Sequence, residues 1–179
     1  MKDILTRLQS GEVLIGDGAM GTMLMERGLK PGECPEAINI NNSLVLEEIA
    51  SLYLKAGADI LQTNTFGGSP LKLAEYNLED KMEEINKNGV LAVQKVADGK
   101  AYVSASCGPS GKMLKPYGDT DPDDIYESYS KQMKVVIEQG VDLICVETMT
   151  DLDEATLAIK AARSISSSIP IMATMTFDA

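Results

Sequence analysis

Residues 140–155 read GVDLICVETMTDLDEA, and this stretch indicates the fold class. Its apolar run, Leu143–Val146, predicts a buried strand, and Gly140 before it is typical of the end of a helix. After the strand, Asp151 with Glu154 three residues later resembles a capping box, which predicts a helix over residues 155–165. A strand placed between two helices in this way indicates a repeated β/α unit with parallel strands.

The same alternation runs along the whole chain. Short apolar runs predict five strands, at residues 13–15, 60–61, 102–103, 143–146 and 171–173. Helical spacing of apolar residues covers 44–56 and stops at Gly57. Two Xaa-Pro pairs, Ser69-Pro70 and Asp121-Pro122, predict further helix starts, the second for a helix ending near Gly140.

Polar residues follow every predicted strand at its carboxyl end. They are Asp17, residues 62–66, residues 104–108, Glu147 with Thr148, and Thr174, Thr176 and Asp178. A β/α barrel assembles its site from many strand ends on one face, whereas a doubly wound sheet concentrates ligand contacts at one switch point. We therefore predict an α/β fold, a partial (β/α)8 barrel of about the first five β/α units. Residues 1–179 are expected to form this single domain, incomplete at its C-terminus.

Composition narrows the class of partner. The chain has 179 residues, 44% hydrophobic, and a formal net charge of -11, which disfavours nucleic acid and anionic membranes as partners. No apolar run approaches the roughly 20 residues that span a bilayer, and no signal peptide opens the chain. Three scattered cysteines, Cys34, Cys107 and Cys145, indicate reduced thiols. These features predict a cytoplasmic protein.

Two glycine-rich stretches imitate nucleotide-binding loops. Residues 16–21, GDGAMG, match G-x-G-x-x-G, but Asp17 would place a carboxylate beside the pyrophosphate, and the next strand ends in QTNT without an acid for the ribose. A P-loop around Gly108–Lys112 would need glycine at Ser106 and Ser or Thr at Met113. Both nucleotide-binding interpretations are therefore disfavoured.

The first stretch suits a different ligand. Asp17 lies at a strand end beside the backbone N–H groups of Gly18 and Ala19, so a carboxylate and anion donors lie together. Glu147 would add a second acid on the same rim. This arrangement suits the ammonium and carboxylate of an amino acid. The alternative is that both acids are hydrogen-bonded rim residues without a ligand.

Six ordered motifs carry a family resemblance. They are GDGAMGTML, PGECPE, AGADILQTNTFGGSPLKLAEY, SASCGPSGKMLKPYGD, GVDLICVETMTDLDEA and PIMATMTFD. Together they resemble the homocysteine S-methyltransferase family, in particular the homocysteine-binding domain of its cobalamin-dependent methionine synthases, from about Leu14 to Asp178. The resemblance implies a (β/α)8 barrel that binds homocysteine at the carboxyl ends of its strands. The implied substrate-binding residues are Asp17 and Glu147 for the ammonium, Gly18 and Ala19 for the carboxylate, and Asn64, Thr65 and Ser106 along the cavity.

The resemblance also implies cofactors that this chain does not hold by itself. Family members bind zinc through three cysteine thiolates on later strands, which would lie beyond Ala179, and Cys34, Cys107 and Cys145 match none of those motifs. We therefore expect no zinc site in this chain and no turnover by the chain alone. The expected methyl donor is methylcobalamin or methyltetrahydrofolate, carried by cobalamin- and folate-binding domains.

Three functions remain open at this stage. The chain is the homocysteine-binding part of a methyltransferase, a non-catalytic binding or assembly module, or a corrinoid-dependent methyltransferase subunit with another methyl donor or acceptor. In each case an open sheet with five of eight units leaves unpaired strand edges. We expect these to be completed by the remaining barrel units or by a second copy of the chain.

Overall fold

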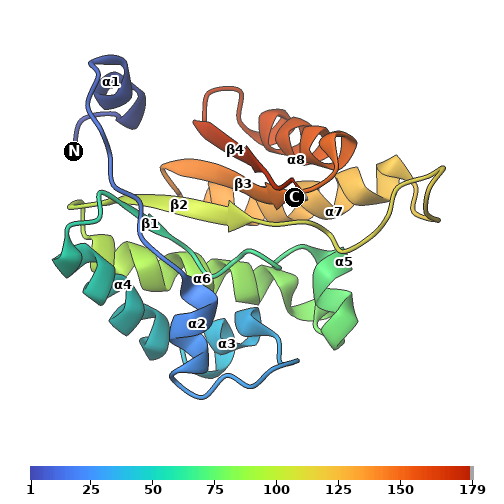
Figure 1. Cartoon of the computed structure of the whole chain (residues 1–179), viewed down its shortest axis with the longest axis horizontal. Helices are drawn as coiled ribbons and strands as arrows, with labels where there is room; N and C mark the ends of the chain where they lie inside the picture. The colour runs from blue at the N-terminus through green and yellow to red at the C-terminus, as the bar shows by residue number, and fades with distance from the viewer. Residues whose placement is uncertain (178–179) are drawn as a thin grey trace.

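The computed structural model describes residues 1–177 and shows a parallel sheet with helices on one face (Figure 1). Four strands follow one another in the order β1-β2-β3-β4, each parallel to its neighbour. Their bounds are Ile60–Gln62, Tyr102–Cys107, Leu143–Met149 and Ile171–Met175. The α/β class and the parallel sheet predicted from the sequence are confirmed. Asp178, expected at the exit of the last strand, lies outside the described residues.

The four longest helices form the outer layer, whereas α1 lies at the amino ends of the strands. The helices are α1 (Ile4–Gln9), α2 (Met20–Met25), α3 (Ile38–Asn41), α4 (Leu44–Ala56), α5 (Pro70–Leu73), α6 (Met82–Ala97), α7 (Pro122–Glu138) and α8 (Leu152–Ile165). Three 3₁₀ turns lie at Pro35–Ala37, Ala74–Tyr76 and Glu79–Lys81. The core lies between the sheet and α4, α6, α7 and α8, where Leu61, Val103 and Ile144 are buried.

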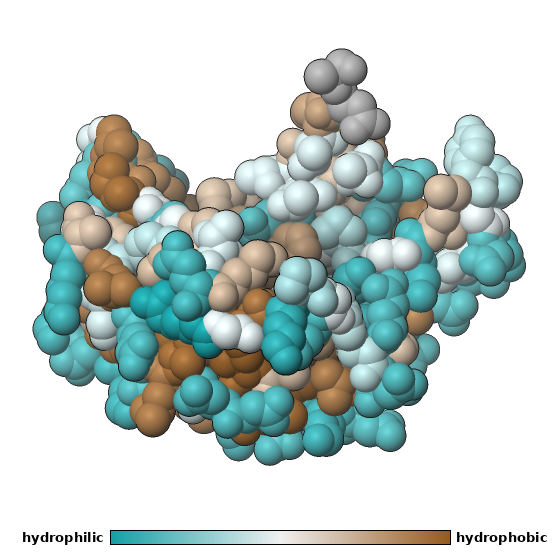
Figure 2. All heavy atoms as spheres, turned by 60° about the horizontal axis from the view of Figure 1, so that its bottom comes forward, coloured by the Kyte–Doolittle hydropathy of each residue, from teal (hydrophilic) through white to brown (hydrophobic). Residues whose placement is uncertain are grey.

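The opposite face of the sheet is the inner face of a partial barrel. Because side chains alternate along a strand, Tyr102, Ser104 and Ser106 lie on this face while Val103 and Ala105 pack against the helices. Tyr102 and Leu143 form a small apolar layer with Ile4 of α1 at the amino ends of the strands. Figure 2 shows the surface dipping between the raised lobe on the left, where α1 lies, and a second raised part at the top centre.

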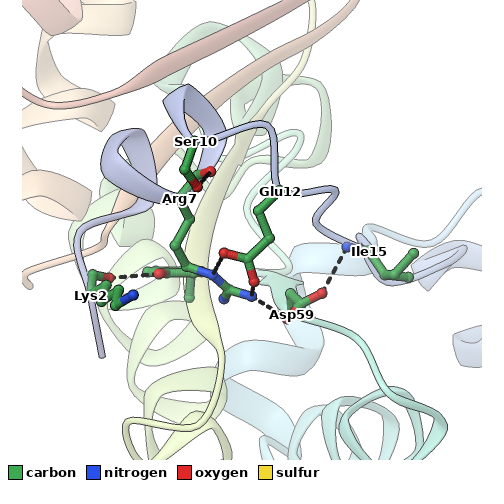
Figure 3. Close-up of polar contacts among 7 residues, drawn as sticks. Lys2, Arg7, Ser10, Glu12, Ile15 and Asp59 are labelled. Atoms are coloured by element: carbon green, nitrogen blue, oxygen red, sulfur yellow. Dashed lines mark hydrogen bonds and ion pairs between the residues drawn. The ribbon is translucent and has the colours of Figure 1, made fainter.

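Polar contacts hold α1 against this end of the sheet (Figure 3). The Arg7 guanidinium pairs with Glu12 and reaches Asp59 Oδ1 at 3.3 Å. It also lies 5.6 Å from the centroid of the Tyr102 ring, and the Tyr102 hydroxyl donates to the Lys2 carbonyl at 2.6 Å. The amino end of the sheet is therefore covered by residues of the chain's own N-terminus.

The prediction of a strand at residues 13–15, the first of the five predicted strands, is wrong. This segment runs beside β1 but forms only an isolated parallel bridge between Gly16 and Ile60. Two carboxylates take the N–H groups that a longer ladder would use: Ile15 N donates to Asp59 Oδ2 at 2.9 Å, and Gln62 N donates to Asp17 Oδ2 at 2.7 Å. The described residues therefore contain four strands with a bridged edge segment.

Helix boundaries follow the predicted signals in part. Ser69 caps α5, but α5 ends after one turn and the longer α6 forms the crossover to β2. Asp151 accepts hydrogen bonds from the N–H groups of Asp153 and Glu154, as a capping residue should. Glu154 does not complete the capping box, because its carboxylate binds the Ser110 N–H and the Tyr129 hydroxyl instead. None of the helices in residues 1–177 is long and apolar enough to cross a bilayer.

Candidate functional site

A cavity of about 590 Å³ lies at the carboxyl ends of the strands. It is lined by Asp17, Gly18, Ala19, Met20, Gly21, Pro35, Glu36, Gln62, Thr63, Asn64, Phe66, Ser106 and Glu147. Six of the seven residues predicted from the sequence to bind substrate are among them. Parallel strands end at one edge of a sheet, which explains how residues so far apart in sequence surround one cavity.

Asp17 and Glu147 are held in place by neighbouring groups. Asp17 Oδ2 accepts the Gln62 N–H at 2.7 Å, and Glu147 Oε1 accepts the Ser106 hydroxyl at 2.6 Å. Burial raises the pKa of Asp17 to about 6, the Gln62 N–H opposes this rise, and the negative charge of Glu147 adds to it. A cation between the two carboxylates would relieve their repulsion.

The sequence predicted that Glu147 follows the strand, but Glu147 lies within β3. The strand continues to Met149, and its register with β4 is irregular between Val146 and Met149. Thr148 has a φ of 60°, which is uncommon for a β-branched residue. Irregularities of this kind re-aim side chains near binding sites, and here one lies beside the carboxylate on the cavity wall.

The Gly18-Ala19 loop is fixed by Tyr53 of α4. The Tyr53 hydroxyl donates to the Ala19 carbonyl at 2.9 Å, and a Cβ built on Gly18 would lie 2.8 Å from that hydroxyl oxygen. Within residues 1–177, no hydrogen-bond acceptor is assigned to the N–H of Gly18 or Ala19. The loop therefore presents two backbone donors beside the cavity while its own position is set from behind.

Gly18→Ala should consequently disturb the loop without disturbing the rest of the fold. The added methyl group collides with Tyr53, so we expect the Tyr53–Ala19 hydrogen bond to be lost and ligand binding to weaken about tenfold, the effect of misplacing one or two donors. Chemical shifts of the Ala19 amide and ligand titration by NMR measure both effects. Gly16→Ala is the matched control, because its added Cβ meets no atom within 4 Å and Gly16 does not line the cavity. Equal binding by both variants would contradict the role of the loop.

Asn64 and Thr65 take different places. Asn64 lines the cavity, and its amide donates to the Pro35 carbonyl at 2.9 Å and to Asn39 Oδ1 at 2.8 Å. Thr65 is not on the wall as predicted: it is fully buried, and its hydroxyl donates to the Ser106 carbonyl at 2.7 Å. Thr65 therefore supports the cavity wall from behind, through its contact with the end of β2.

The predicted substrate-binding set did not include a third carboxylate, Glu36, or Gln62, Phe66 and Tyr53. Glu36 is 4% exposed and lines the cavity, where its Oε1 accepts the Gly67 N–H at 2.7 Å. Its position in the PGECPE motif was a signal that could have been used. Three carboxylates and neither Lys nor Arg line the described cavity, which therefore favours cations.

The three cysteines do not fit a zinc site. Cys34 packs with Leu73 and Ile85, Cys107 lies in the core beneath the helices, and Cys145 is buried in β3. Burial, as the largest cause, raises the pKa of Cys34 to about 11, that of Cys145 to about 12, and that of Cys107 well above its usual range. Residues 1–177 contain no group of three or more His, Cys, Asp or Glu side chains placed to hold a metal ion. In the described residues these three thiols are therefore not grouped as zinc ligands.

Comparisons with known proteins give matches over most of the chain. Residues 14–179 match the family model described as homocysteine S-methyltransferase. The methionine synthases of Mycobacterium leprae and Mycobacterium tuberculosis are 34% and 35% identical to the chain, over 90% and 86% of its length. The chain spans 14% of the length of either relative.

Solved structures show the same fold. The metallated form of the Escherichia coli homocysteine methyltransferase MmuM superimposes with a TM-score of 0.75 at 20% identity. This match covers 97% of the chain and 66% of MmuM. The apo form of MmuM gives a TM-score of 0.73 at 18% identity, covering 94% of the chain and 61% of MmuM. The chain therefore has the fold of about two thirds of a TIM barrel.

Proposed function

Because the chain belongs to the homocysteine S-methyltransferase family, we propose that it forms the homocysteine-binding part of a methyltransferase that converts homocysteine to methionine. One observation carries this proposal. Asp17 and Glu147 line one cavity together with the Gly18-Ala19 loop, so groups that suit an ammonium and a carboxylate lie side by side. A free amino acid carries both of these charges.

Each group has a distinct task in this proposal. Asp17 and Glu147 accept hydrogen bonds from the substrate ammonium, and the N–H groups of Gly18 and Ala19 donate to its carboxylate. Gln62 and Ser106 hold the two carboxylates in position through the bonds described above. Fixing the amino-acid end in this way restricts where the sulfur lies, which is the protein's contribution to orienting a methyl acceptor.

Other parts of the reaction come from outside the residues described. We propose that methylcobalamin or methyltetrahydrofolate supplies the methyl group from cobalamin- and folate-binding domains. The remaining barrel units, or a second copy of the chain, would complete the wall around the cavity. Zinc would activate the substrate thiol in the complete family enzyme, but Cys34, Cys107 and Cys145 do not form a site for it, so we assign it no ligand in this chain.

Titration of L-homocysteine against the wild-type chain and Asp17→Asn tests the proposal. Wild type should bind with a dissociation constant near millimolar, worth about 4 kcal/mol. Removing one charged acceptor should weaken binding about tenfold or more. The control Glu26→Gln makes the same change in net charge at an exposed residue and should bind like wild type. Equal affinity of wild type and Asp17→Asn would show that Asp17 is only a structural rim residue.

A further inference from the structure

We propose that Phe66, seated on the backbone of Gly108, is the apolar wall that receives the side chain of the bound amino acid and selects for its length. This inference rests on the proposed function, because it takes the ammonium and carboxylate to be held at Asp17, Glu147 and the Gly18-Ala19 loop. It adds a specificity-determining residue on a different segment of the chain, the loop after β1.

Phe66 is well placed for such a role. It lines the same cavity as Asp17 and Glu147 and is partly buried there. Its carbonyl accepts the Gly108 N–H at 2.8 Å, which ties the loop after β1 to the end of β2. An amino acid held by its charged end in this cavity has its side chain within a space that the Phe66 ring borders.

The Phe66 ring occupies the space that a side chain at Gly108 would fill. A Cβ built on Gly108 would lie 2.4 Å from Phe66 Cζ and 2.5 and 2.6 Å from the two Cε atoms, all closer than real carbon contacts. Gly108 is not among the glycines with positive φ, so its backbone would accept other residues. The Phe66 ring is therefore the obstacle to a side chain at Gly108, and any added methyl group must displace the ring.

The loop that contains Gly108 is held in place by buried hydrogen bonds. The Tyr129 hydroxyl lies 3.1 Å from the Gly108 carbonyl and 2.8 Å from Glu154 Oε1. The same carboxylate oxygen accepts the Ser110 N–H at 2.7 Å. Tyr129 and Ser110 are fully buried and Glu154 is 4% exposed. The loop after β2 cannot yield easily, so a methyl group at Gly108 moves the ring and not the loop.

A ligand series separates the ring from the charged groups. Glycine has no side chain to contact Phe66, whereas L-2-aminobutyrate and L-norvaline have progressively longer ones. If these side chains contact the Phe66 ring, each added methylene should raise the affinity about fourfold. We would titrate all three against wild type, Phe66→Leu, Gly108→Ala and the double variant by NMR. Gly108→Ala should weaken norvaline about tenfold and glycine less than twofold. In the Phe66→Leu background the same substitution should cost less than twofold, because the clash has been removed.

Each result bears on one of the two proposals. Equal losses for glycine and norvaline, or a Gly108→Ala effect that persists in the Phe66→Leu background, would overturn the wall. If Gly108→Ala fails to fold, Phe66→Leu decides alone, since it should reduce the gain from glycine to norvaline. Asp17→Asn is titrated in parallel: no effect on any ligand would overturn the amino-acid site itself. If Asp17→Asn weakens all three ligands equally, the amino-acid site is supported. If the Phe66 and Gly108 variants then show no dependence on ligand length, only the proposed role of Phe66 is overturned.

Discussion

Replacing Glu154 with alanine should lower the free energy of unfolding by about 3 kcal/mol, the largest stability effect that we expect from a single polar residue. The carboxylate is 4% exposed and accepts hydrogen bonds from the Ser110 N–H and the Tyr129 hydroxyl. Alanine leaves the first donor buried without an acceptor and the second with only the Gly108 carbonyl at 3.1 Å. Urea unfolding followed by circular dichroism should show a lower midpoint with an unchanged slope.

Two further variants identify the cause of this loss. Asp153→Ala removes an exposed carboxylate from the same first turn of α8, so it measures the interaction with the helix dipole, about 0.3–1 kcal/mol. Glu154→Gln keeps an acceptor oxygen of the same shape and should lose less than Glu154→Ala. If Asp153→Ala were as destabilising as Glu154→Ala, the buried hydrogen bonds would not be the reason.

Much of the fold was predictable because strands and caps leave local signals. The run Leu143–Val146 and the cap at Asp151 depend on residues within a few positions of each other, and both are present in the structure. Convergence at the cavity followed from a rule of topology, since parallel strands end at one edge. For that reason Asp17, Ser106 and Glu147 could be placed together from the sequence.

The strand predicted at residues 13–15 does not form, and the sequence of this segment alone does not show the reason. Val13 and Ile15 look like buried strand residues but are 81% and 56% exposed. Whether such a run extends a sheet depends on its partner, and here the carboxylates of Asp17 and Asp59 take the N–H groups on either side of the Gly16–Ile60 bridge. Propensity is a weak guide where side chains compete for ladder hydrogen bonds.

The missed site residues depend on contacts between distant segments. Tyr53 meets the Ala19 carbonyl across 34 positions of sequence, and Phe66 meets Gly108 from a different strand exit. Gly108 reads simply as a loop glycine, and nothing near it indicates that a ring occupies the space of its absent side chain. The same holds for Thr65, whose burial behind the wall depends on the Ser106 carbonyl.

Amino-acid binding should weaken about tenfold for each pH unit below 6 and level off above it. The folded chain without ligand holds the pKa of Asp17 at about 6, mainly through burial. The substrate ammonium favours the ionised carboxylate, so binding must release the proton that Asp17 carries below that pH. The sign follows from this linkage: protons compete with the ligand, and affinity rises with pH until Asp17 is ionised in the free protein.

L-2-Aminobutyrate is the suitable probe, because it has no thiol and its own charges do not change between pH 5 and 7. The dissociation constant of the wild-type chain should be about tenfold higher at pH 5 than at pH 7. Asp17→Asn should bind more weakly at pH 7 and change less than twofold over the same range, since the titrating carboxylate is gone. Isothermal calorimetry in two buffers of different ionisation enthalpy would also detect the released proton in wild type at pH 5. A flat wild-type profile would mean that binding releases no proton from Asp17, and an equal slope in Asp17→Asn would mean that another group controls the affinity; either result would contradict ammonium binding at Asp17.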